Sequence, residues 1–161
     1  MFSRYILLMF LFCWLGGNAR NTTDKLFFEH LTTEDGLSHN YIQSIFQDED
    51  GFIWLGSDNG LNCYDGQRID VFTTHTQPIT LGGNRIRGIV QDKDKNLWIL
   101  HENGVDRLMH STRRIKTIYY EGEHKKGLYG MGIDMDGNWI GYSEKHLVKC
   151  DSGKDTLYVF K

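Results

Sequence analysis

Three short acidic segments hold the side chains whose types and spacing could support chemistry. They read DEDG from Asp48, DKDKN from Asp92 and DMDGN from Asp134, so each places two carboxylates two residues apart. Calcium loops use this spacing, but they also need further oxygen ligands and a correctly placed glycine. On a turn between two strands, Asp and Asn side chains accept hydrogen bonds from backbone N–H groups. Because lysines enter the second segment, we expect turns here and no metal or other cofactor.

Histidines and nucleophiles are the next candidates for catalysis. The chain has 7 histidines, and none stands in a His-x-His or His-Glu-x-x-His pattern. The sequence also contains no Gly-x-Ser-x-Gly elbow and no phosphate-binding loop. We therefore predict no catalytic, cofactor-binding or metal-binding residue, and we do not expect this chain to be an enzyme.

Ligand binding is harder to assign than catalysis. The loops SHN (38–40), GGNR (82–85) and KKG (125–127) each precede an expected strand, so they are expected on one face. Arg85 and Arg87 could meet an acidic sugar there. The asparagine that recurs in the first two loops favours turn chemistry instead, and the ligand-binding residues stay unknown.

The acidic segments belong to a larger repeat. Positions of the first unit return 44 residues later, as from Trp54 to Trp98, and the third unit follows 42 residues later with one residue missing before Trp139. A period in the low forties with one Trp per unit is typical of propeller blades or solenoids. We expect the three tryptophans at one position of successive second strands, where they would form the core between blades.

The pattern inside each unit selects between these two architectures. In YIQSIF (41–46), Ile42, Ser44 and Phe46 alternate with Tyr41, Gln43 and Ile45, which is the period of a strand. FIWLGS, LNCYD and RIDVF follow, separated by the turns DEDG, DNG and GQ. Apolar spacings of three and four, which a two-helix repeat requires, are missing. The sequence therefore predicts an all-β fold, a partial β-propeller of about three four-stranded antiparallel blades with an N-terminal orphan strand.

Charge and cysteines limit the remaining function classes. The net charge is -3 with both signs scattered, and the lack of a basic stripe makes nucleic acid an unexpected partner. Cys63 and Cys150 fall in the third strands of the first and third units. Strands two blades apart lie beyond the reach of a disulfide, so two free thiols are expected.

The N-terminus has the features of a secretory signal peptide. Arg4 precedes an apolar run from Tyr5 to Leu15, and Gly17 and Ala19 place small residues where signal peptidase cleaves. The run is too short to cross a bilayer ~30 Å thick as a helix. Cleavage after Ala19 is expected, and an uncleaved anchor is the alternative.

The first unit resembles a known repeat. GLSHNYIQSIFQDEDGFIWLGSDNGLNCYDG, from Gly36 to Gly66, resembles the two-component regulator propeller repeat almost throughout. The second unit departs from the pattern, with Lys95 in place of a glycine and His101 in place of a threonine. A structural role is the favoured interpretation of His101. The resemblance extends over roughly Phe27 to Phe160.

This resemblance implies the extracytoplasmic sensor of a hybrid two-component system in glycan-degrading bacteria. It implies a periplasmic location, an oligosaccharide ligand, and a strand at Phe27–Leu31 that pairs with the last blade of a ring. Membrane association and kinase activity would come only from further C-terminal regions. The expected segments are a signal peptide (1–19), an N-terminal strand region (20–35) and three blades (36–79, 80–121 and 122–161).

Three blades are too few for a ring, since closed propellers have roughly four to eight. We therefore expect a fragment of a longer sensor. The alternatives are self-association through open blade faces, a secreted propeller enzyme such as a lyase, and a non-functional gene remnant that folds poorly.

Overall fold

The computed structural model describes residues 28–118, 128–144, 146–151 and 156–160. The expected signal peptide (1–19), residues 20–27 and the KKG loop lie outside the described residues. The chain divides into two compact units, Met1–His30 and Leu31–Lys161. All three sheets belong to the second unit.

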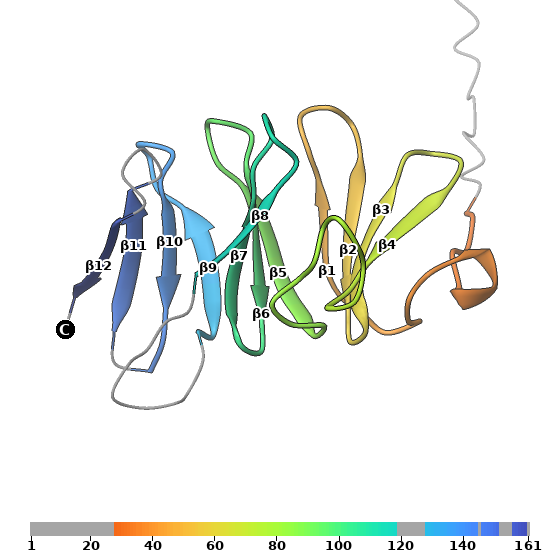
Figure 1. Cartoon of the computed structure of the whole chain (residues 1–161), viewed down its shortest axis with the longest axis horizontal. Helices are drawn as coiled ribbons and strands as arrows, with labels where there is room; N and C mark the ends of the chain where they lie inside the picture. The colour runs from red at the N-terminus through yellow and green to blue at the C-terminus, as the bar shows by residue number, and fades with distance from the viewer. Residues whose placement is uncertain (1–27, 119–127, 145, 152–155, 161) are drawn as a thin grey trace, which may run out of the picture. The chain divides into compact units, whose positions relative to one another are not determined.

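The described chain is almost entirely β-structure, as predicted (Figure 1). One 3-10 turn, η1 (Thr33–Asp35), precedes three four-stranded antiparallel sheets whose strands follow one another in chain order. The first sheet contains β1 (Ile42–Gln47), β2 (Ile53–Ser57), β3 (Gly60–Tyr64) and β4 (Ile69–Phe72). The second contains β5 (Ile86–Gln91), β6 (Leu97–His101), β7 (Gly104–Leu108) and β8 (Ile115–Ile118). The third contains β9 (Gly130–Ile133), β10 (Trp139–Tyr142), β11 (Leu147–Asp151) and β12 (Thr156–Phe160).

Each sheet is a blade of hairpins, and its strands lie within the residue range expected for one blade. Between β2 and β3 the turn is tight, and Gly60 (φ +128°), the first residue of β3, supplies a backbone conformation that a side chain would disfavour. The fold class is confirmed: the sheets are those of a β-propeller. The exact blade boundaries stay predictions.

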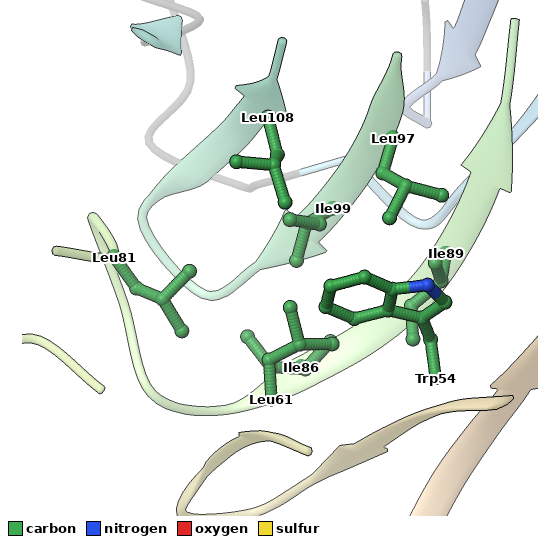
Figure 2. Close-up of a cluster of buried hydrophobic side chains, with 8 residues drawn as sticks. All are labelled: Trp54, Leu61, Leu81, Ile86, Ile89, Leu97, Ile99 and Leu108. Atoms are coloured by element: carbon green, nitrogen blue, oxygen red, sulfur yellow. The ribbon is translucent and has the colours of Figure 1, made fainter. Parts of the chain in front are cut away.

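The second sheet lies between the first and the third. All five residues of β6 are buried, which explains why the LWIL run is apolar without alternation. Figure 2 shows the core between the first two sheets, where Trp54 of β2 and Leu61 of β3 meet Ile86, Ile89 and Ile99 of the second sheet. The sheets approach closely at Gly56, where an added Cβ would lie 2.7 Å from Cγ2 of Ile86.

A second core joins the second and third sheets. Its buried members are Trp98, Leu100, Val105, Leu128, Trp139, Val148 and Cys150. Burial of a large apolar side chain contributes roughly 1.5–3 kcal/mol, so the two cores supply much of the stability of this unit.

The opposite face of the third sheet is apolar and open to solvent. Tyr142 is 53% exposed, Leu147 45% and Phe160 50%. The corresponding faces of the first and second sheets carry Trp54 and Trp98 and are covered by the next sheet. The exposed end face that the repeat predicts is therefore present.

The strand expected at Phe27–Leu31 is not formed in the described residues. Residues 28–32 have no regular secondary structure, and Phe27 lies outside the described part. A strand requires a ladder partner, and each of the three described sheets is complete with four strands of its own.

Candidate functional site

The paired acids form turns, as the sequence predicts. Oδ1 of Asp48 accepts hydrogen bonds from the backbone N–H groups of Asp50 (3.0 Å) and Phe52 (2.9 Å), and Oδ2 accepts one from Nε1 of Trp54 (2.7 Å). One carboxylate thus fixes the β1–β2 turn and orients the core tryptophan. No cluster of metal-ligating side chains is found among the described residues.

The second turn repeats this arrangement. Oδ1 of Asp92 accepts from the N–H groups of Asp94 (3.0 Å) and Asn96 (2.9 Å), and Oδ2 accepts from Nε1 of Trp98 (2.8 Å). Lys95 adopts φ +62°, the left-handed conformation for which glycine is suited. Its ammonium group lies 2.9 Å from the carboxylate of Asp50 in the neighbouring turn. Both side chains are partly exposed, so this ion pair carries little desolvation penalty. The hydrogen bond from Lys95 lowers the pKa of Asp50.

The third turn keeps the backbone contacts but loses the indole contact. Oδ1 of Asp134 accepts from the N–H groups of Asp136 (2.9 Å) and Asn138 (2.8 Å). Its Oδ2 lies 2.6 Å from Nζ of Lys149, which lowers the pKa of Asp134. Nε1 of Trp139 instead lies 3.1 Å from Sδ of Met131.

The expectation that the three tryptophans share one position is wrong for Trp139. Trp98 pairs with Arg107 across the ladder, whereas Trp139 pairs with Cys150 and so matches the pair of Leu97 with Leu108. The third turn has the same length as the second, since Asp134 N–H bonds Asn138 O as Asp92 N–H bonds Asn96 O. The missing residue therefore moves Trp139 one place along the strand, and one place reverses the face on which a side chain lies.

The asparagines of the expected ligand loops are structural, as turn chemistry predicts. Oδ1 of Asn40 accepts from the N–H of Thr33, and Oδ1 of Asn84 accepts from the N–H of Thr74, both at 2.8 Å. Arg85 lies with its Nε 3.5 Å from Asp58 Oδ1 on the exposed surface. Arg87 is exposed. The structure therefore does not bring the two arginines together around a described cavity.

His101 is part of the buried framework. Its Nδ1 accepts from the N–H of Asn103 (3.2 Å). Nε2 is 3.4 Å from Oδ1 of Asp106 but outside hydrogen-bonding geometry, and both side chains are fully buried. Oδ1 of Asp106 also accepts from the hydroxyl of Thr117 at 2.6 Å.

Two buried side chains that hold these loops were not predicted from the sequence. Oδ1 of Asn62 accepts from the N–H of Ser38, and Oδ2 of Asp106 accepts from the N–H of Gly82, both at 2.8 Å. Both acceptors are fully buried on the third strand of their blade. The available signal was a polar residue at the same place in two successive apolar strands.

Neither Cys63 nor Cys150 forms a disulfide, as predicted. Cys63 is half-buried, and burial raises its pKa to about 11. Cys150 is fully buried beside Trp139. Within the described residues, the structure has no helix long and apolar enough to cross a membrane.

Comparison with known families identifies the repeat. The profile described as "Two component regulator propeller" matches residues 36–59 and 80–103, which hold the first two strands of the first two sheets and the loops before them. These two segments are two-component regulator propeller repeats. The matched residues do not extend to the third sheet, whose tryptophan is displaced.

Relatives of this repeat chain are much longer. Histidine kinase P4 of Formosa agariphila is 30% identical over 70 residues, which are 44% of this chain and 5% of that protein. The extracellular domain assigned to hybrid two-component system BT3049 of B. thetaiotaomicron is 21% identical with a TM-score of 0.72, over 83% of this chain and 20% of that one. This chain therefore spans a small part of both.

The propeller fold also occurs in enzymes. Virginiamycin B lyase from Staphylococcus aureus is 15% identical with a TM-score of 0.63, over 83% of this chain and 44% of that one. At this identity the likeness concerns the fold alone.

Proposed function

We propose that this chain is part of the extracytoplasmic sensor of a hybrid two-component system, in which propeller blades recognise a glycan. The observation that carries the proposal is the pair of two-component regulator propeller repeats in the first two blades. The structural likeness to an extracellular sensor domain supports it, as does the presence of a histidine kinase among the relatives. Catalysis and signal output would belong to other parts of a longer protein.

Recognition is favoured over catalysis by the chemistry of the described residues. The histidine and the acids near the GGNR loop bind backbone N–H groups. His101 accepts from Asn103, and Asp106 accepts from Gly82. Glu102 accepts from the N–H groups of Asn84 (3.2 Å) and Arg85 (2.8 Å). Carboxylates occupied in this way fix loop shape. A lyase would need an acid or base with access to substrate.

Two measurements test the proposal. The full chain expressed in a Gram-negative host should be recovered from the periplasm, with a mature N-terminus at Arg20 by mass spectrometry. The same protein, labelled at its amines, should bind some oligosaccharides on an array that presents neutral, carboxylated and sulfated glycans. A folded chain that binds none of them, or that stays in the cytoplasm, would contradict the proposal.

A further inference from the structure

A cavity of about 170 Å³ lies between the first and second sheets. Phe52, Trp54 and Phe72 supply its aromatic wall, and the rings of Trp54 and Phe72 stack with centroids 6.1 Å apart. Cys63 of β3, Leu108 of β7 and Ile79 complete the apolar lining.

The interface between the second and third sheets shows by comparison why this cavity forms. Between the second and third sheets, Trp98 is covered by the stacked ring of Trp139 (5.4 Å between centroids) and by Arg107, whose Cζ lies 5.4 Å from the ring. In the interface between the first and second sheets, the matching ladder positions hold Leu97 and Cys63, which are both much smaller. The cavity therefore results from two specific small residues beside Trp54.

A wider surface hollow of about 500 Å³ adjoins the cavity. The two share Ile79 and Arg113, and the hollow adds Arg114 and the segment Pro78–Thr80. A compact inner slot with a wider outer part suits one ring of a larger ligand, since pockets for drug-sized molecules measure about 300–1,000 Å³.

The charged groups around this groove are unevenly paired. Arg68 is close to Asp65 (3.4 Å) and Asp70 (3.5 Å), so its charge is compensated. Arg113 and Arg114 have exposed side chains, and neither makes an ion pair with a described residue. The β7–β8 turn holds Arg113 in place, because its N–H donates to the carbonyl of Met109 at 2.9 Å. The mouth of the groove therefore favours an anionic group.

The remaining polar groups favour hydroxyls. Oδ1 of Asp65 is held by the backbone N–H groups of Arg68 and Gln67 (2.8 Å each), which lower its pKa, so the exposed carboxylate of Asp70 is the acceptor offered to a ligand hydroxyl. An aromatic wall packs against the C–H face of a sugar ring, while carboxylates and guanidinium groups bind its polar edge.

We propose that the groove between the first two blades binds a saccharide ring that carries an anionic substituent, with the ring against Phe52 and Phe72, the partly exposed part of the aromatic wall, and the anion at Arg113 and Arg114. This inference rests on the proposed glycan-sensing function and gives it a site between the first two blades.

Cys63 provides a reporter of occupancy. It lines the cavity and is half-buried, whereas Cys150 is fully buried and serves as an internal control. The full chain would be alkylated with N-ethylmaleimide at a mildly alkaline pH, and the modification of each cysteine followed by mass spectrometry. The probes would be D-glucuronic acid, D-glucose 6-sulfate and neutral D-glucose.

We expect saturating glucuronic acid to slow alkylation of Cys63 at least fivefold, while glucose has little effect. Protection by glucose 6-sulfate as well would define the ligand by its charge, and protection by the uronic acid alone would define it by its carboxylate. The double variant Arg113→Ala/Arg114→Ala should bind glucuronic acid at least tenfold more weakly by saturation-transfer NMR. Cys63→Arg, which introduces the residue found at position 107, should abolish that signal, and Cys63→Ser should retain it.

Unchanged alkylation with every probe, or equal protection in the double arginine variant, would overturn the inference. Circular dichroism would verify that each variant is folded. If the array shows binding of an anionic glycan while Cys63 stays unprotected, the sensor proposal stands and this site is wrong. If the array shows no binding, the sensor proposal itself fails.

Discussion

The indole of Trp139 stacks on the indole of Trp98, with ring centroids 5.4 Å apart and planes inclined by 16°. The two tryptophans lie on strands β6 and β10, which belong to facing sheets, and both are almost fully buried. The contact arises because Trp139 occupies the strand position of Leu97 and so points back toward the second blade. A one-residue difference in sequence has thus converted a repeated core position into a tryptophan pair.

This stacked pair should give exciton-coupled circular dichroism in the far ultraviolet. Trp139→Ala should remove that signal and lower the free energy of unfolding by about 3–5 kcal/mol, because a large buried side chain is lost. Urea unfolding followed by circular dichroism would measure both effects. Trp54→Phe is the matched control, since Trp54 stacks on Phe72 and not on a second indole. A coupled signal that survives Trp139→Ala would contradict the pairing.

The bond between Asp92 and the indole of Trp98 can be tested separately. Asp92→Asn keeps one oxygen that can accept from the turn N–H groups. Its amide NH2 group would then face the indole N–H of Trp98, so two donors would oppose each other. We expect a coupling energy of about 1.5–3 kcal/mol in a double-mutant cycle of Asp92→Asn with Trp98→Phe, the range for a hydrogen bond to a charged group. The same cycle for Asp134 and Trp139 should give almost none, because that indole faces Met131. Equal coupling in both cycles would disprove the distinction.

The repeat made most of the fold predictable. Strand alternation around Ile42 and Phe46, together with turn residues at a fixed period, was enough to predict four-stranded sheets in chain order. The acidic turns were also predictable, since Asp48 and Asp92 do in the structure what Asp does in turns generally.

The face on which Trp139 lies was less predictable, because it depends on whether the one-residue deletion falls in the turn or in the strand. A gap before Trp139 could shorten the turn or move the strand by one place, and only the ladder of Trp139 with Cys150 distinguishes the two. The groove beside Trp54 was equally hidden. It depends on Leu97 and Cys63 being small at positions that meet only after two sheets pack.

Lys95 allows a test of backbone strain. Its φ of +62° is disfavoured for residues with a side chain, and glycine should relieve this by about 1 kcal/mol. Lys95→Gly and Lys95→Ala both remove the ion pair with Asp50, so their difference isolates the backbone effect. We expect Lys95→Gly to be the more stable of the two in urea unfolding. An equal or greater stability of Lys95→Ala would contradict a left-handed conformation at this turn.

The ion pair of Asp134 with Lys149 predicts a pH dependence of stability. The folded-state pKa of Asp134 is depressed below its unfolded value of roughly 3.9, so the contribution is present at neutral pH and is lost as the pH falls through the folded-state pKa. The stability difference between the wild type and Asp134→Asn should therefore shrink below about pH 4. Lys149→Met should weaken this dependence. A difference that stays constant from neutral to acidic pH would contradict the prediction.

The open face of the third sheet predicts self-association. Tyr142, Leu147 and Phe160 are each about half exposed on a surface whose equivalents in the other two blades are covered. Sedimentation velocity should show a weight-average mass that rises with concentration, since exposed apolar sheet faces drive association. Leu147→Lys should shift this rise to at least tenfold higher concentration, while Ile45→Lys, on an exposed position of β1, should have a smaller effect. A chain that stays monomeric at every concentration, or a Leu147→Lys variant that associates like the wild type, would show that this face is not the contact.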